Sequence, residues 1–208
     1  MVGTSFSFVT LPNGNVRMYY FTGPGGNPAD ALLSGTSSDA LTWTSDAGTG
    51  IVLDDIAVPN VVALIGGGYR VYYTTSGGPT GIASATSSDG LTFSADPGRR
   101  LSPTGQYDWG DPNVVISGNA YLMSATQWPS QPGYSSIWLS SSPDGLTWTT
   151  DANAVITNAT GSPVDSSFVA LANGAFRVYY GLFIGLTSPS GNSAASEVLS
   201  VVLSPAGS

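Results

Sequence analysis

The 208-residue sequence contains no cysteine, no histidine and no lysine. The absence of cysteine excludes disulfides and thiolate chemistry. Without histidine and lysine, the chain also lacks the imidazole base, the Schiff-base amine and the commonest zinc ligand. These three absences exclude most nucleophilic and zinc-dependent enzymes, and we expect no cofactor.

Charge is also scarce, because only 9% of the residues are charged and the formal net charge is −8. An acidic surface repels phosphate backbones, so we expect no nucleic-acid partner. No apolar run approaches the length of a membrane helix, and we expect no membrane insertion. The low charge, the missing cysteines and one Asn-x-Thr sequon at Asn158 favour an extracellular or cell-surface location.

The chain repeats itself. The stretches "SSDALTW", "SSDGLTF" and "SPDGLTW" stand at 37–43, 87–93 and 142–148, and "LSPAGS" at the C-terminus resembles a shortened fourth copy. Upstream of them "VRMYY", "YRVYY" and "FRVYY" begin at Val16, Tyr69 and Phe176. Internal repeats of this length are typical of arrays of similar structural units.

Within each copy an apolar segment, a Gly/Asn turn, an aromatic segment, a loop and a small-residue segment follow in the same order. This order predicts four short antiparallel strands for each copy. Four-stranded sheets repeated at this period predict an all-β fold, a single β-propeller domain whose last blade is incomplete, with a β-sandwich as the alternative. We place the blades at 1–53, 54–107, 108–160 and 161–208.

Residues that recur in three of the four copies are expected to be structural. Asp39, Asp89 and Asp144 should accept hydrogen bonds from backbone N–H groups within their turns, and Ala40 should leave the first of these turns looser than a glycine would. The arginines that recur in register should support the blades: Arg17, Arg70 and Arg177.

The motifs "SSDGLTF" and "SPDGLTW" resemble the Asp-box turns of sialidase-type propellers, and "DPNVV" at 111–115 followed by a "YRVYY"-type strand resembles blades of five-bladed arabinanases, xylosidases and fructosidases. The resemblance covers nearly the whole chain. It implies a glycosidase-like propeller, complete with four blades or part of a five-bladed ring, that engages carbohydrate. In those enzymes two aspartates begin inner strands and a glutamate on another blade donates the proton.

The loops on one end of the blades vary in length and sequence, and this end is where we expect function. By repeat register and by the resemblance, the candidate catalytic carboxylates there are Asp55, Asp111 and Asp165. Aromatic planes beside carboxylates suit sugars, which stack their C–H faces on rings. The candidate ligand-binding residues on the same end are Tyr107, Asp108, Trp109, Trp128 and Tyr134.

Three functions stay open. The equivalent inner-strand positions in the first two copies are Ser5 and Val58, and the only glutamate, Glu197, falls early in an outer strand, so the catalytic set is incomplete. We therefore favour a non-catalytic glycan-binding or structural role over a hydrolase that uses Asp111 and Asp165 with another aspartate or Glu197 as proton donor. An assembly protein that oligomerises through its incomplete blade edge is the third alternative. A further alternative is that the aspartates at the channel mouth hold Ca²⁺, which takes oxygen ligands alone.

Overall fold

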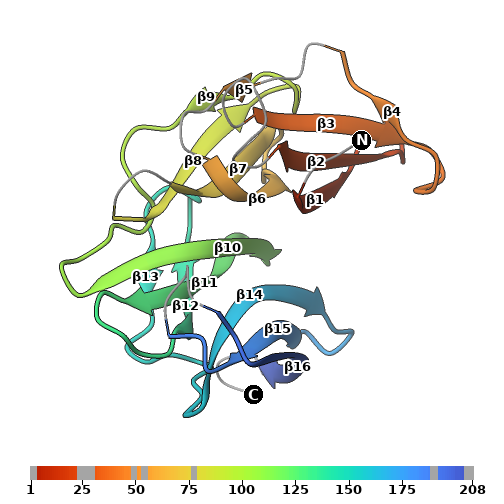
Figure 1. The fold of residues 1–208 in the computed structure, drawn as a ribbon. Helices are drawn as coiled ribbons and strands as arrows, with labels where there is room; N and C mark the ends of the chain where they lie inside the picture. Colours follow the sequence, from red (N-terminus) through yellow and green to blue (C-terminus); the bar gives the residue numbers. More distant parts are fainter. Residues whose placement is uncertain are drawn as a thin grey trace. The chain divides into compact units, whose positions relative to one another are not determined.

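The computed structural model describes residues 4–22, 31–47, 51–52, 56–75, 79–187 and 192–203. The chain divides into two compact units, Met1–Leu101 and Ser102–Ser208. Each unit contains two antiparallel sheets whose strands follow one another in chain order. Figure 1 shows the described chain as strands and turns, which confirms the predicted all-β class and the meander order within each blade.

Unit 1 contains blades 1 and 2. The strands of blade 1 are β1 (Thr4–Thr10), β2 (Val16–Thr22), β3 (Ala31–Ser37), β4 (Thr44–Ser45) and β5 (Ile51–Val52). The strands of blade 2 are β6 (Ile56–Ala63), β7 (Tyr69–Thr75), β8 (Ile82–Ser87) and β9 (Ser94–Ala95).

Unit 2 contains blades 3 and 4. The strands of blade 3 are β10 (Tyr107–Ser117), β11 (Ala120–Pro129), β12 (Ser136–Ser142) and β13 (Thr149–Thr150). The strands of blade 4 are β14 (Gly161–Ala170), β15 (Phe176–Ile184) and β16 (Ala195–Leu203). Blade 4 thus has three strands in the described part of the chain, and the predicted shortened motif at 204–208 lies outside the described residues.

One element was not predicted. Short strand β5 pairs with β3 beside the fourth strand, joining Leu32 to Ile51. The same contact recurs as isolated bridges from Ile82 to Leu101 and from Ile137 to Ile156. Each of blades 1 to 3 therefore ends with an apolar residue that returns to the third strand and covers its exposed edge.

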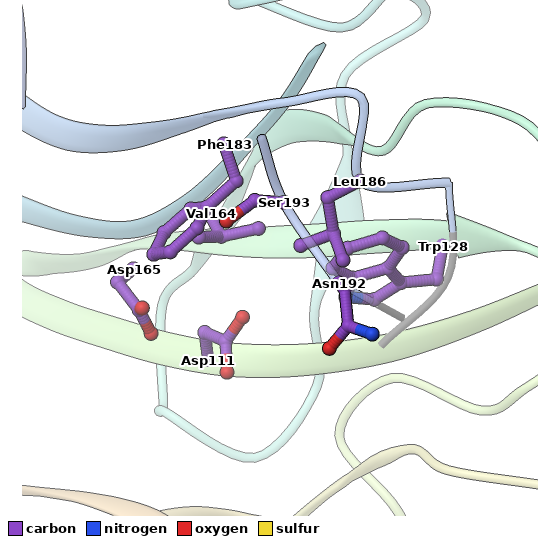
Figure 2. Close-up of a pocket in the computed structure, with 8 residues that line it drawn as sticks. All are labelled: Asp111, Trp128, Val164, Asp165, Phe183, Leu186, Asn192 and Ser193. Carbon is purple, nitrogen blue, oxygen red and sulfur yellow. The ribbon is translucent and has the colours of Figure 1, made fainter. Parts of the chain in front are cut away.

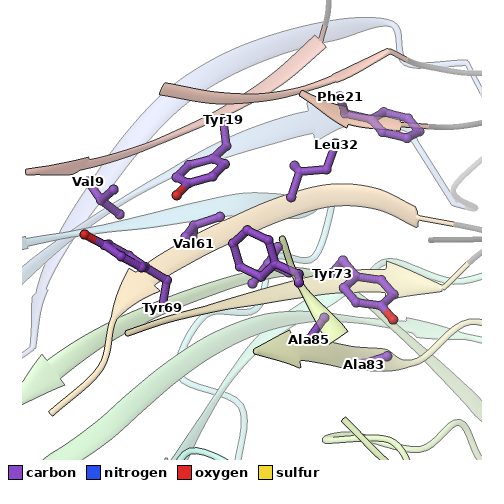
Figure 3. Close-up of a cluster of buried hydrophobic side chains, with 11 residues drawn as sticks. Val9, Tyr19, Phe21, Leu32, Val61, Tyr69, Tyr73, Ala83 and Ala85 are labelled. Atoms are coloured by element: carbon purple, nitrogen blue, oxygen red, sulfur yellow. The ribbon is translucent and has the colours of Figure 1, made fainter. Parts of the chain in front are cut away.

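The interior of each unit lies between its two sheets. In unit 1, Val9 and Tyr19 of blade 1 pack against Val61, Tyr69 and other buried residues of blade 2 (Figure 3). In unit 2, Ile137 of blade 3 packs with Phe168 and Val178 of blade 4. Burial of these side chains between sheets supplies the hydrophobic free energy that holds two blades together.

The repeated Asp turns have the structural role that the sequence predicts. In each turn a carboxylate oxygen accepts two backbone N–H groups, as Asp89 does from Leu91 and Thr92 at 2.7 and 2.9 Å. These hydrogen bonds lower the pKa of Asp39, Asp89 and Asp144 to about 2, because they favour the charged carboxylate.

The expected loosening of the first turn is wrong. Ala40 adopts φ +57°, and Asp39 keeps both backbone hydrogen bonds, from Leu41 at 2.8 Å and Thr42 at 2.7 Å. The glycine of the second turn is required for a different reason. A Cβ on Gly90 would lie 2.6 Å from the Tyr19 hydroxyl, which donates a hydrogen bond to the Gly90 carbonyl at 2.8 Å.

The recurring arginines are confirmed as structural. Arg17 pairs with Asp46 at 3.1 Å and Arg70 pairs with Asp96 at 3.0 Å, in equivalent places of blades 1 and 2. In blade 4, Arg177 donates a hydrogen bond to Ser200 Oγ at 3.1 Å. Each of the two ion pairs links a second strand to the segment that follows the fourth strand of its blade.

Every first strand contains a β-bulge in the same place. The pairing register shifts between Thr4 and Phe6, Ala57 and Asn60, Gly110 and Asn113, and Val164 and Ser167. The residue within each bulge has a left-handed backbone conformation although none is glycine: Ser5 (φ 53°), Val58 (46°), Asp111 (53°) and Asp165 (52°). This backbone equivalence confirms the repeat register that the sequence predicts for these four positions.

Candidate carbohydrate-binding site

Asp111 and Asp165 of unit 2 occupy bulges, and bulges commonly redirect a side chain beside functional sites. Aspartate tolerates the left-handed region better than most residues, because its short polar side chain hydrogen-bonds locally. Strain of this kind persists where surrounding contacts hold it in place. The bulges of β10 and β14 therefore present two carboxyl groups away from the regular ladder of the strands.

Two hydrogen bonds hold the bulged strands beside each other. The Phe168 backbone N–H donates to Asn113 Oδ1 at 3.1 Å, joining β14 to β10. Ser166 Oγ donates to Ser124 Oγ at 2.8 Å, joining β14 to β11. Both contacts are within three residues of a bulge aspartate, so they fix the Asp111 and Asp165 carboxyl groups as neighbours.

A pocket of about 490 Å³ opens beside these carboxyl groups. Its lining residues are Asp111, Trp128, Val164, Asp165, Phe183, Leu186, Asn192 and Ser193. Figure 2 shows the two carboxyl groups on one side of the pocket and the Trp128 indole on the other, with Asn192 beside the indole. The pocket lies where first strands begin and second strands end, which is the end of the blades that the variable loops indicate.

Buried serines support the apolar wall of this pocket. Ser162 Oγ donates to the Leu186 carbonyl and accepts the Ser135 N–H at 3.0 Å. Ser135 Oγ in turn donates to the Pro163 carbonyl at 2.7 Å. These bonds tie the β11–β12 loop to β14 and to the chain after β15, so that Val164 and Leu186 stay in place beside Trp128.

The two carboxyl groups influence each other. Burial, and then the charge of Asp165, raise the pKa of Asp111 to about 7. Burial also raises the pKa of Asp165. Asp165 is the more exposed of the two and Asp111 is half-buried, so we assign the proton at neutral pH to Asp111. Neighbouring carboxyl groups with raised pKa values hold a shared proton more readily than two separate charges.

One buried hydroxyl group adjoins the pair. Thr126 Oγ1 is buried and has no hydrogen-bond partner among the described residues. It is nonetheless close enough to Asp111 to lower the pKa of that carboxyl group, against the larger effect of burial. Because Thr126 is fully buried and is not among the lining residues, it influences the pocket through the Asp111 carboxyl group.

The structure places the predicted site residues as follows. Asp111, Asp165 and Trp128 line the pocket. Trp109 is buried and contacts the Trp138 ring edge-on, and neither it nor Asp108 is among the lining residues. Tyr107 and Tyr134 are exposed outside the lining, and Asp55 lies outside the described residues.

Sequence reasoning missed five of the lining residues and the Thr126 hydroxyl. Asn192 and Ser193 fall in the long loop of blade 4, whose length was the available signal. Val164, Phe183 and Leu186 carried no signal, because apolar residues near strand ends are indistinguishable from ordinary core. Glu197 is the third residue of β16, is exposed, and does not line the pocket.

The described residues contain no group of three or more acidic side chains arranged to hold a metal ion. In the same part of the chain no helix has the length and hydropathy needed to cross a bilayer.

The sequence matches no protein-family model and no curated protein. Solved structures do match. An α-L-arabinanase of Penicillium chrysogenum bound to arabinobiose has a TM-score of 0.66 and 15% identity over 96% of this chain and 66% of its own. A thermostable family-43 glycoside hydrolase has a TM-score of 0.72 and 15% identity over 95% and 70%.

The GH93 α-L-arabinofuranosidase of Fusarium graminearum, also bound to arabinobiose, has a TM-score of 0.70 and 13% identity over 96% of this chain and 62% of its own. The chain therefore spans about two thirds of the length of these hydrolases. At such low identity the likeness establishes the fold. The protein is a β-propeller of the kind found in glycoside hydrolases, as the sequence predicts.

Proposed function

We propose that the pocket of unit 2 binds a short carbohydrate without cleaving it. The observation that carries this proposal is the arrangement of the pocket, in which an indole and a phenyl ring face two adjacent carboxyl groups. Sugars present C–H faces for stacking on aromatic rings and hydroxyl groups that donate to carboxylates. The propellers of similar fold include two that bind arabinobiose.

Cleavage is the second candidate, and the pKa of Asp111 favours it. Glycoside hydrolysis uses one protonated carboxylic acid and one carboxylate on either side of the scissile bond. Asp111 has the raised pKa of such an acid. However, Asp111 and Asp165 come from neighbouring bulges and interact directly, and Glu197 lies outside the lining. Binding therefore fits the described pocket better than hydrolysis does.

Native mass spectrometry with arabinobiose and a set of neutral disaccharides tests the proposal. We expect intact disaccharide on the protein, and loss of this complex in Trp128→Ala. The matched control is Trp148→Ala, because Trp148 lies beside the Asp144 turn, where its indole N–H donates to the Gly145 carbonyl. Shortened sugars that disappear in Asp111→Asn would instead establish a hydrolase. No complex with any sugar would overturn both carbohydrate functions.

The assembly role stays a prediction, and β16 is the strand that would carry it. Among the described residues β16 pairs on one side only, with β15, and Val198 is 79% exposed on it. The same mass spectra report the number of subunits, so a multimer without bound sugar would favour assembly. An extracellular location is part of our proposal and rests on the low charge, the missing cysteines and Asn158.

A further inference from the structure

The third strands of blades 1 to 3 are covered along their outer edge by one recurring segment. Its copies are "TSDAGTGI" at 44–51, "SADPGRRL" at 94–101 and "TTDANAVI" at 149–156. Each copy begins with the fourth strand and continues with an aspartate whose backbone N–H donates to the third strand at 2.9 to 3.0 Å. Each ends with an apolar residue that pairs with the same third strand. The shared pattern is Ser/Thr, Ser/Thr/Ala, Asp, four further residues and Ile/Leu.

Blade 4 presents the same edge without this segment among the described residues. Its third strand, β16, pairs with β15 alone in that part of the chain (Figure 1). The residue four positions after each recurring arginine pairs with the third strand at Leu32, Ile82 and Val198 in blades 1, 2 and 4. Leu32 and Ile82 are 2% and 0% exposed, whereas Val198 is 79% exposed. The position that the apolar end of the segment covers in the other blades is therefore open in the described part of blade 4.

The aspartate of the segment is held by side chains of the second and third strands. In blade 1, Asp46 accepts a hydrogen bond from Ser34 Oγ at 2.6 Å and pairs with Arg17 at 3.1 Å. In blade 2 the same two distances are 2.6 and 3.0 Å, and the equivalent residues are Asp96, Ser84 and Arg70. An arginine and a serine thus form a binding place for one carboxylate in each of these blades.

Blade 4 keeps these two donors. Ser200 is equivalent to Ser34 by pairing register, and Arg177 donates to its Oγ at 3.1 Å. Arg177 forms no ion pair among the residues that the structure describes. Val202 stands where Thr36 donates to the carboxylate at 2.8 Å in blade 1, so blade 4 has two of the three side-chain donors. The edge of β16 therefore presents an arginine and a serine placed for a carboxylate.

We propose that the edge of β16 binds an extended segment of another polypeptide that carries the same pattern. The first two residues of that segment pair with Val202 and Val201. Its aspartate lies against Arg177 and Ser200, and its apolar residue covers Val198. Addition of a strand pairs the backbone groups along a sheet edge, and side chains then give specificity. The proposal is independent of the carbohydrate pocket, because none of the pocket-lining residues belongs to β16.

A second copy of this chain fits the edge less well. Its own three segments already cover the third strands of its blades. Antiparallel pairing of two β16 strands brings one acidic residue from the partner copy, Glu197. Because side chains alternate along a strand, Glu197 lies on the face opposite Ser200 in both copies. The carboxylate for Arg177 therefore comes from a segment with the recurring pattern.

Fluorescence anisotropy with a labelled, end-capped peptide of the sequence of residues 41–51, "LTWTSDAGTGI", tests the proposal. We expect this peptide to bind, and its Asp46→Asn version to bind about tenfold more weakly, because hydrogen bonds to charged groups are the stronger ones. Hydrogen exchange of residues 195–203 should slow in the complex, because the outward amide groups of β16 become paired. Equal binding of both peptides, or no binding of either, would overturn the proposal and leave the carbohydrate function untouched.

Variants of the protein locate the peptide at β16. Arg177→Gln should weaken binding about tenfold, and Val202→Thr, which restores the third donor, should strengthen it by a few-fold. Val198→Lys changes an exposed residue and should weaken binding by removing the apolar contact. The control is Arg99→Gln, which makes the same charge change at an exposed arginine of unit 1. If Arg99→Gln weakens binding as much as Arg177→Gln does, the proposal is wrong.

Sedimentation velocity distinguishes the two occupants of the edge. A monomer that binds the peptide supports the proposal. A dimer that excludes the peptide and dissociates in Val198→Lys would show that a second copy occupies β16, and this result would overturn the proposal.

Discussion

Units 1 and 2 contain the same pair of bulged first strands, yet only unit 2 has carboxyl groups at the bulges. The residues in the bulges are Ser5 and Val58 in unit 1, and Asp111 and Asp165 in unit 2. Around the equivalent strands unit 1 packs the large side chains Phe21, Leu32 and Tyr73 into its core. The comparison shows that the fold provides the same backbone positions in both units. The residue at each bulge then decides whether a carboxyl group stands there.

The units also differ in how they stabilise their outer strands. Blades 1 and 2 use the Arg17–Asp46 and Arg70–Asp96 ion pairs. In blade 3 the residue equivalent to Arg70 is Leu122, because both occupy the same pairing position between the second and third strands. Leu122 packs against the core of unit 2. A buried ion pair and an apolar contact thus serve the same place in the repeat, as expected if the two are close in net stability.

The largest effect that tests this comparison is expected for Arg70→Ala. Arg70 is 7% exposed, and Asp96 also accepts hydrogen bonds from Ser84 and Thr86. Removal of the arginine leaves a largely buried carboxylate without its counter-ion, which should lower the free energy of unfolding by about 3 kcal/mol. Urea denaturation followed by circular dichroism measures the change.

The matched variant in unit 2 is Leu122→Ala, which removes apolar contacts from a partly buried position and should cost about 1 to 2 kcal/mol. A cost below about 0.5 kcal/mol for Arg70→Ala would show that the ion pair contributes no more than an exposed one. The ion pair of blade 2 and the apolar contact of blade 3 would then differ in their contribution to stability, contrary to what we infer.

Asp111→Asn should have a smaller effect on the free energy of unfolding, and it should stabilise the protein where Arg70→Ala destabilises it. The pKa of Asp111 is raised to about 7 in the folded state, whereas that of an aspartate in the unfolded chain is near 4. Protonation of Asp111 therefore favours folding fully below about pH 4, and this stabilisation is lost as the pH rises through about 7. The variant should match the parent at about pH 4 and be more stable by about 1 to 3 kcal/mol at pH 8. Urea denaturation between pH 4 and pH 8 measures the difference.

Asp144→Asn provides the contrast within the same unit. The pKa of Asp144 is lowered to about 2 by backbone hydrogen bonds, so its stabilising effect is present above the unfolded pKa and is lost as the pH falls through about 2. This variant should be destabilised at neutral pH. If both variants respond to pH with the same sign, the contrast between pocket and turn carboxyl groups fails.

The smallest effect is expected for Val58→Asn in unit 1. Val58 is β-branched and has φ +46°, a conformation that asparagine adopts more readily. The substitution should raise the free energy of unfolding by about 0.5 to 1 kcal/mol. Val62→Asn on the same strand is the control, because Val62 is buried within a regular part of the strand and should lose stability. A loss for both would show that the bulge stores no strain.

Much of the fold could be predicted from the sequence, because its determinants are local and repeated. Hairpin glycines, short apolar and aromatic segments and the Asp turns each depend on a few consecutive residues, and their recurrence revealed the blades, the turn carboxylates and the structural arginines. The equivalence of Ser5, Val58, Asp111 and Asp165 also followed from repeat register, although the sequence did not predict that these residues lie in bulges. Ala40 was the exception, since the carboxylate hydrogen bonds of Asp39 hold the turn without a glycine.

The site was only partly predictable. Asp111, Asp165 and Trp128 could be named from register and composition, but the sequence could not separate Trp128, which lines the pocket, from Trp109, which packs against Trp138. Both are tryptophans near the same end of neighbouring strands. The direction in which each one points depends on the partner strand and not on its neighbours in sequence.

The sequence by itself therefore determined the class of structure, the strand order within each blade and the positions at which carboxyl groups stand. The tertiary structure alone decided that Asp111 and Asp165 interact, that Thr126 is buried beside them, and that Asn192 and Ser193 line the pocket. The physical reason is that burial and electrostatic coupling depend on distances between atoms of separate strands, and these distances are set when the two sheets of a unit pack together.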